Sequence, residues 1–217
     1  MEESKERVLL RNLILAAVFT ALAFGSEFLI HFKVSFLSYD AKDAILAIGS
    51  MFYGPLLGLF SALITSFFEM LTVSTTGIWG FIMNFVSTAT FVCVASLIYK
   101  KIHTLKGAVM GLSASVFLMT AVMMPMNLII TPIYTGTNVE TVLKMMPKLL
   151  LPFNFAKSVL NASLTLLLYK PVFTALRSAK IIKTGEKMTF DKKTIIITIV
   201  GAVLSTASVL CLIFVIK

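Results

Sequence analysis

The sequence predicts an all-α, polytopic membrane protein: a bundle of six helices, the second of them short, followed by a seventh transmembrane helix. Three observations lead to this prediction. Hydrophobic residues make up 58% of the 217 residues and charged residues only 13%, and the mean hydropathy of +0.96 is far from the average of soluble domains. The apolar residues form runs whose lengths suit a bilayer. The positive charges are concentrated between particular pairs of these runs.

Apolar runs divide the chain into seven segments. All except the second are long enough to cross a hydrocarbon core of about 30 Å. We expect a six-helix membrane domain over residues 1–176, a basic cytoplasmic linker over 177–193 and an additional transmembrane helix over 194–217. The seven segments are Val8–Ile30, Ala41–Met51, Leu56–Val73, Trp79–Tyr99, Gly107–Tyr134, Leu149–Phe173 and Thr194–Ile216.

The second segment, Ala41–Met51, is too short to span a membrane by itself. It follows the polar stretch Ser38-Tyr39-Asp40 and ends at Tyr53-Gly54-Pro55, which predicts a tight turn into the next helix. A short helix that is reached through a polar loop typically lines a cavity. Asp40 has two interpretations of equal weight, as the N-terminal cap of this helix or as a partner for ligand hydroxyls.

The distribution of Lys and Arg predicts a cytoplasmic N-terminus and, after the seventh segment, an outside C-terminus. Thirteen of the nineteen positive residues fall on one side in this arrangement, whereas Lys33, Lys42, Lys144 and Lys148 fall in loops on the opposite side. The thirteen are Lys5, Arg7, Arg11, Lys100, Lys101, Lys106, Lys170, Arg177, Lys180, Lys183, Lys187, Lys192 and Lys193. The net charge of +9 is therefore explained by the positive-inside rule, and no motif points to nucleic acid.

Lys157 is the strongest candidate for a functional residue. It is the only full charge in the stretch Leu149–Tyr169, and an ionisable group at membrane depth usually faces the protein interior and has a function. Asn154 lies three residues earlier, so that its amide and the Lys157 ammonium share one face of a helix. This pair suits a ligand edge rich in carbonyl groups and ring nitrogens.

Other polar and aromatic residues are weaker candidates. Trp79 is interpreted as an interfacial anchor or, alternatively, as a stacking wall for an aromatic ligand. Asn84 and Asn127 are interpreted as interhelical hydrogen-bonding groups or as ligand contacts. Glu27 and Glu69 lie near the outer ends of helices, where solvation would explain them.

Catalysis and metal binding have no support in the sequence. No Walker A, HExxH or GxSxG pattern occurs, and Cys93 and Cys211 lie singly in apolar segments, which excludes a CxxC motif. We expect no enzymatic activity, no cofactor and no metal site. Ala17, Ala21 and Gly25 form a ladder of small residues on the first helix, which permits close approach of another helix, either within this bundle or from a partner.

Five strings in this order resemble the substrate-binding S components of energy-coupling factor (ECF) transporters, with the riboflavin-specific RibU type as the closest match. The resemblance runs from Val8 to Phe173, the seventh segment is additional to it, and its most specific part is the PFNFAK string at Pro152–Lys157. The five strings are FLSYDAKDAI, GSMFYGPLLGL, GIWGFIMNF, MNLIITPIYTG and LPFNFAKSVLN.

This resemblance implies a vitamin-binding subunit with an outward-facing cavity, which docks on a transmembrane scaffold subunit and two ATPase subunits and topples to release its substrate inside the cell. It implies docking through Ala17 and Ala21. The implied ligand contacts are Asn127, Asn154, Lys157, Ser38, Tyr39 and Asp40. We therefore expect riboflavin as the transported substrate. The alternatives are another heteroaromatic vitamin, a facilitator that works without ATPases and, least supported, a membrane-embedded enzyme.

Overall fold

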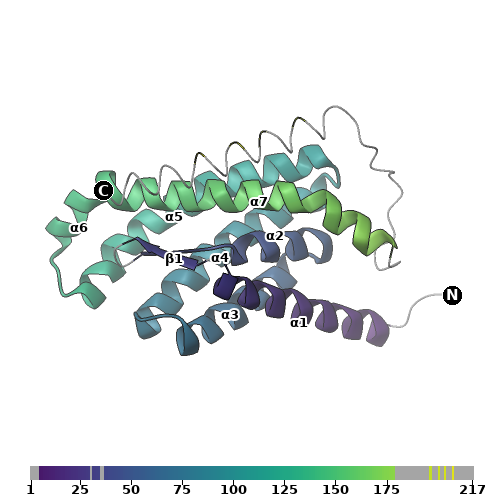
Figure 1. The fold of residues 1–217 in the computed structure, drawn as a ribbon, viewed down its shortest axis with the longest axis horizontal. Helices are drawn as coiled ribbons and strands as arrows, with labels where there is room; N and C mark the ends of the chain where they lie inside the picture. The colour runs from purple at the N-terminus through teal and green to yellow at the C-terminus, as the bar shows by residue number, and fades with distance from the viewer. Residues whose placement is uncertain are drawn as a thin grey trace.

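The structure is a computed structural model. It describes residues 5–29, 31–34 and 37–178 and the isolated positions 196, 200, 203 and 207. Figure 1 shows the helices running roughly along one long axis, with a small hairpin between them. The elements are α1 (Lys5–Leu29), β1 (His31–Val34), β2 (Leu37–Asp40), α2 (Lys42–Tyr53), α3 (Pro55–Thr72), α4 (Gly77–Lys101), α5 (Leu105–Thr135), α6 (Val139–Met145), the π-helical turn η1 (Met146–Leu150) and α7 (Leu151–Ser178).

The predicted six-helix core is confirmed. Five helical stretches within the described residues are long and apolar enough to span a membrane, and the last of them runs without a break from α6 through η1 into α7. The short helix α2 completes the six. The predicted linker beyond Ser178 and the predicted seventh helix lie outside the described residues, apart from the isolated positions.

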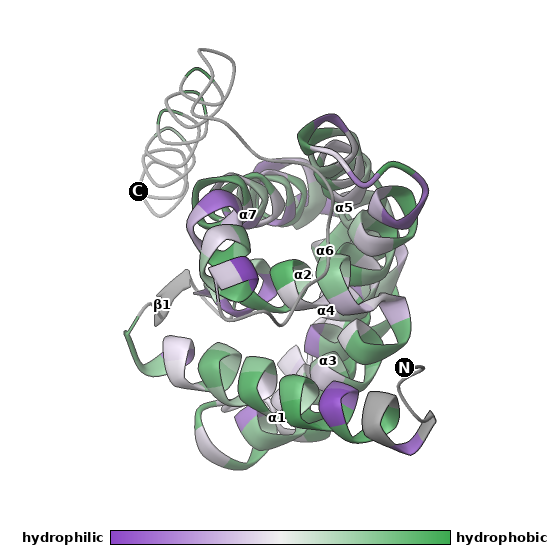
Figure 2. Ribbon diagram, turned by 90° about the vertical axis from the view of Figure 1, so that its right-hand side faces the viewer, coloured by the Kyte–Doolittle hydropathy of each residue, from purple (hydrophilic) through white to green (hydrophobic). Residues whose placement is uncertain are grey.

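The helix α2 lies at the centre of the bundle. It packs against α1, α3, α4 and α7, and Figure 2, which looks along the long axis, shows it surrounded by the longer helices. Nine of its twelve residues are buried. It ends at Gly54, whose φ of 102° belongs to the region that favours glycine, and Pro55 then begins α3 at a position where no N–H is needed.

A two-stranded antiparallel hairpin connects α1 to α2, where the sequence predicted only a polar loop. His31 pairs with Asp40 and Val34 with Leu37, so that the two strands lie side by side along their whole length. Successive residues of a strand point to opposite faces. Tyr39 therefore points to the opposite face of the strand from Ser38 and Asp40. It is buried against Phe153, Ala156 and Leu160 of α7.

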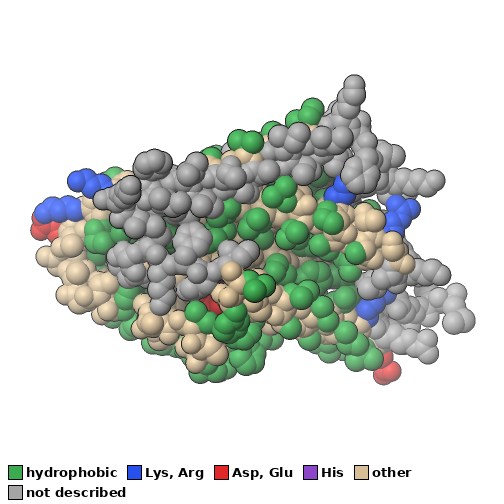
Figure 3. Space-filling model, viewed as in Figure 1, with side chains coloured by type: hydrophobic (Ala, Val, Ile, Leu, Met, Phe, Trp, Pro, Cys, Tyr) green, Lys and Arg blue, Asp and Glu red, His purple; other side chains and the backbone are tan. Residues whose placement is uncertain are grey.

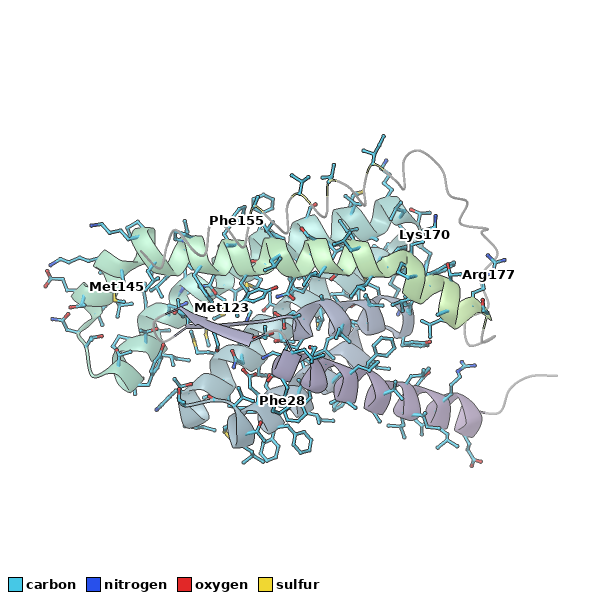
Figure 4. All side chains as sticks on the ribbon, viewed as in Figure 1. Phe28, Met123, Met145, Phe155, Lys170 and Arg177 are labelled. Carbon is cyan, nitrogen blue, oxygen red and sulfur yellow. The ribbon has the colours of Figure 1, made fainter. Side chains whose placement is uncertain are left out.

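Exposed apolar side chains cover the bundle, as expected of a protein whose solvent is lipid. In Figure 3 hydrophobic side chains occupy the middle of the visible face, and the described Lys and Arg side chains lie towards the two ends. Figure 4 places Met145 at one end of the molecule and Lys170 and Arg177 towards the other, where α1 begins. The two ends correspond to the two predicted membrane surfaces.

Aromatic rings fill the bundle at the end where α1 begins. Phe52 stacks on Tyr169, with 5.6 Å between ring centroids, and Tyr99 and Tyr169 share a hydrogen bond of 2.6 Å between their hydroxyl groups. Phe173 contacts both rings, with its centroid 6.2 Å from that of Tyr169 and 5.9 Å from that of Phe52. This aromatic cluster lies at the end of the bundle away from the hairpin.

Candidate ligand-binding site

A polar-walled cavity lies between the hairpin, α4, α5 and α7. The cavity volume is about 60 Å³, and the space between its walls, with the open mouth included, is about 530 Å³. Five of the predicted ligand contacts line it: Ser38, Asn84, Asn127, Asn154 and Lys157. The other lining residues were not predicted from the sequence as contacts: Leu37, Thr76, Gly80, Met83, Ser87, Met123, Tyr134 and Phe153.

Lys157 is held in place by the hairpin. Its Nζ donates to Asp40 Oδ2 at 3.0 Å and to the main-chain oxygen of Ser38 at 3.4 Å. The Lys157 side chain is 5% exposed, and Asp40 is fully buried. An ammonium group has three donors, and these two contacts leave one of them for a ligand in the cavity that Lys157 lines.

The two asparagines beside Lys157 are oriented by their own helices. Asn154 Nδ2 donates to the main-chain oxygen of Leu150 at 2.8 Å, and Asn127 Nδ2 donates to that of Met123 at 2.7 Å. The Oδ1 atom of Asn127 also accepts from Thr131 at 3.1 Å. Each amide is thus fixed by a hydrogen bond one helical turn back, which restricts the orientation in which it can meet a ligand.

Three predicted contacts do not line the cavity. Asp40 contacts Lys157 instead, and it does not cap α2, because the residue at the cap position is Ala41 and no side chain caps that helix. The capping interpretation was therefore wrong. Tyr39 is buried against α7, and burial, followed by the nearby carboxylates of Asp40 and Asp43, raises the pKa of its phenol above the usual range.

Trp79 also lies outside the cavity lining. It is half-buried and packs against the main hydrophobic core, so a role as a stacking wall does not fit its position. The next residue, Gly80, lines the cavity instead. The helical spacing of Gly80, Asn84 and Ser87 is the sequence signal that could have identified the wall formed by α4.

A buried network of charged groups adjoins the cavity. Lys42 is completely buried, and it forms ion pairs with Glu27 Oε1 at 3.2 Å, with Asp40 Oδ2 at 3.5 Å and with Glu69 Oε2. Two sequence interpretations are thus wrong. Glu27 and Glu69 are each only 1% exposed, not solvated, and Lys42 is an interior residue of the bundle, not a loop charge. Their burial follows from the central position of α2.

Ala17 and Ala21 lie in a second, apolar groove, which shares no lining residue with the cavity. Both are exposed and line a groove between α1 and α3 with a volume of about 840 Å³. Gly25, the third member of the ladder, is exposed but does not line it. The rest of the lining is mostly aliphatic and aromatic: Leu9, Asn12, Leu13, Ala16, Thr20, Phe24, Tyr53, Leu56, Leu57, Phe60, Ile64 and Phe68.

Comparison with known proteins decides the family. The family model described as "ECF transporter, substrate-specific component" matches residues 11–173. The chain belongs to this family. It is thus the S component of a transporter and a multi-pass membrane protein. The described residues hold no group of three or more His, Cys, Asp or Glu side chains that could bind a metal.

A solved structure supports the same assignment. The S component is similar to a chain described as "Structure and mechanism of the S component of a bacterial ECF transporter", with 25% sequence identity and a TM-score of 0.66. The match covers 76% of this chain and 97% of the solved one. The comparison with curated proteins gives no significant match.

Proposed function

We propose that this S component binds riboflavin in the cavity between the hairpin, α4, α5 and α7, and delivers it across the plasma membrane of a prokaryote. The observation that supports this most is the convergence of Lys157, Asn154 and Asn127 on one cavity. The isoalloxazine ring of riboflavin is flat and apolar on its faces, and its edge has two carbonyl groups and an imide N–H. An asparagine amide pairs with an imide by donating and accepting, and a lysine donates to a carbonyl oxygen or ring nitrogen.

The apolar part of the cavity suits the faces of such a ring. Phe153, Met83 and Met123 line it together with the polar groups. The space of about 530 Å³ with the mouth included lies in the range of small-molecule sites. The cavity volume of about 60 Å³ is much smaller, so binding requires the hairpin or the methionines to move. Methionine side chains, such as Met123 in Figure 4, adapt easily in this way.

We also propose that transport depends on a scaffold subunit and two ATPase subunits. The groove that Ala17 and Ala21 line is apolar and exposed, which suits a helix of the scaffold subunit packing closely against α1. In this arrangement the N-terminus is cytoplasmic and the cavity faces outwards. The S component itself hydrolyses no ATP in this proposal.

The direct test is purification of the protein from cells that contain riboflavin, followed by a visible absorption spectrum and titration of the ligand-free protein with riboflavin. A flavin spectrum and saturable binding are expected. Binding of a different heteroaromatic vitamin, with no affinity for riboflavin, would keep the family and contradict the substrate. Uptake that persists in cells without the ATPase subunits would instead indicate a facilitator.

A further inference from the structure

Glu69 connects the buried charge network to the wall of the cavity. Its Oε2 atom is paired with the Lys42 ammonium, and its Oε1 atom accepts a hydrogen bond of 2.7 Å from Asn84 Nδ2. Asn84 lines the cavity, whereas Glu69 and Lys42 do not. The two oxygens of one carboxylate thus hold a lysine on one side and a cavity residue on the other.

This geometry determines which way the Asn84 amide faces. An ion-paired carboxylate only accepts hydrogen bonds, and the other oxygen of Glu69, Oε2, already accepts from the Lys42 ammonium, which can only donate. The NH₂ group of Asn84 must therefore face Glu69, which decides between two amide orientations that differ only in the exchange of nitrogen and oxygen. The Oδ1 atom of Asn84 is left as the acceptor that this side chain offers to the cavity.

We propose that Glu69 and Lys42 are positioning residues that determine specificity: they hold Asn84 as a hydrogen-bond acceptor, so that the cavity takes a ligand with an O–H or N–H donor at this position. Lys157, from α7, presents a donor to the same cavity. The site therefore has a donor and an acceptor on different helices. This inference rests on the proposed function and adds to it the chemistry that α4 recognises.

Glu69→Gln reverses the orientation of Asn84 without changing the size of the side chain. Because Lys42 can only donate, it requires the oxygen of the introduced glutamine, whose NH₂ group then faces Asn84. Asn84 has to turn its own oxygen to that group and its NH₂ group to the cavity. A donor group of the ligand would then face the NH₂ group of Asn84, which is also a donor. The hydrogen bond between the ligand and Asn84 is therefore lost.

The experiment is a double-mutant cycle with riboflavin as the probe, measured on purified protein in detergent by quenching of flavin fluorescence. Glu69→Gln and Asn84→Leu are each expected to weaken riboflavin binding about tenfold. The double variant should bind like Asn84→Leu alone, because Glu69 acts through Asn84. Additive losses would show that Glu69 has only a structural role and would overturn the proposal.

Lys42→Met together with Glu69→Gln gives a second, opposite test. Without Lys42, the introduced glutamine is able to turn its oxygen to Asn84 and restore the original orientation. This charge-balanced variant should bind riboflavin more tightly than Glu69→Gln alone. If the single variant does not fold, the comparison is with Asn84→Leu, which has no acceptor and should bind more weakly than the charge-balanced variant. Equal or weaker binding by the folded double variant would overturn the proposal.

Thr88→Val is the matched control. Thr88 lies one turn from Asn84 on α4 and donates to the buried Asp43 at 2.6 Å, but it does not line the cavity. This variant should lose thermal stability and keep riboflavin affinity. A loss of affinity as large as that of Glu69→Gln would show that any buried polar defect in α4 disturbs the site, and would count against a specific role for Glu69.

Lumiflavin, which has the flavin ring but no ribityl chain, identifies the donor. If Glu69→Gln weakens riboflavin but not lumiflavin, Asn84 accepts from a ribityl hydroxyl; if it weakens both equally, Asn84 accepts from the ring N–H. Unchanged affinity for both flavins would overturn this inference while leaving the proposed function intact. Failure of the unmodified protein to bind riboflavin would overturn the proposed function and this inference with it.

Discussion

Lys157 and Asp40 lie 117 residues apart in the chain, yet Lys157 Nζ is 3.0 Å from Asp40 Oδ2 inside the bundle. The contact joins the hairpin to α7 at the edge of the cavity. Lys42 approaches the same oxygen at 3.5 Å. Asp40 is therefore shared between a lysine that lines the cavity and one that is buried behind it, and the two lysines are expected to respond differently to substitution.

Lys157→Met should leave the fold intact and weaken riboflavin binding. The fold is retained because Lys42 still neutralises Asp40. Affinity falls because a charged hydrogen bond of about 1.5–3 kcal/mol is lost, which is a change of about ten- to 150-fold in Kd. Titration of the folded variant with riboflavin measures this change. Unchanged affinity would exclude Lys157 from the site.

Asp40→Asn should destabilise the protein itself. It leaves the buried Lys157 ammonium beside a partner that has lost its charge, and breaking a buried ion pair by removing one partner costs about 3–5 kcal/mol. The measurement is thermal unfolding in detergent. Ser38→Ala is the control, because Ser38 contributes only its main-chain oxygen to Lys157, and it should unfold close to the unmodified protein.

The double variant Asp40→Asn with Lys157→Met refines this prediction. Lys42 keeps its ion pairs with Glu27 and Glu69, so Lys157 is the ammonium group that Asp40→Asn leaves without a charged partner. Removing Lys157 as well eliminates this uncompensated charge, and the loss of stability in the double variant should be smaller than the sum of the two single losses. Strictly additive effects would show that the contact between Lys157 and Asp40 contributes little to stability.

The long helices could be predicted from the sequence because the bilayer sets their length. The segment Leu56–Val73, for example, was predicted from hydropathy alone and corresponds to α3, Pro55–Thr72. Lys157 and Asn154 could be placed on one cavity wall for a similar reason, since helical periodicity needs no knowledge of the partners. The short helix α2 was predicted from its length and its flanking polar residues.

The hairpin and the charge network could not be predicted in this way. Strands of four residues, such as His31–Val34, give too short an alternation to distinguish them from a loop. The positions of Glu27 and Glu69 near helix ends suggested solvent. Their burial depends on the insertion of α2, which brings Lys42 between them, and such a contact between distant segments has no local sequence signal.

Site-specific labelling should confirm the orientation. After replacement of Cys93 and Cys211 by Ala, a cysteine placed in residues 177–193 should react only from the cytoplasm and one placed after Lys217 only from outside. A cysteine at Glu140, an exposed residue of α6, should also react only from outside. Labelling of 177–193 and the C-terminus from the same side would show that Thr194–Ile216 does not span the membrane.

Ala17→Leu combined with Ala21→Leu should abolish ATP-driven riboflavin uptake and leave riboflavin binding to the isolated subunit nearly unchanged. Both alanines are exposed in the groove between α1 and α3, so larger side chains there do not disturb the packing of this bundle. They would instead hold a partner helix away from α1. The measurements are uptake into cells that express the complete transporter and titration of the purified subunit.

Val18→Leu is the control for this pair of substitutions, because Val18 is 47% exposed on the same helix but does not line the groove. It should support normal uptake. Loss of binding together with uptake in the double variant would show that the ladder of small residues packs within the bundle. Normal uptake by the double variant would show that the groove is not the surface through which the S component docks, since a close helix contact cannot accommodate two added leucine side chains.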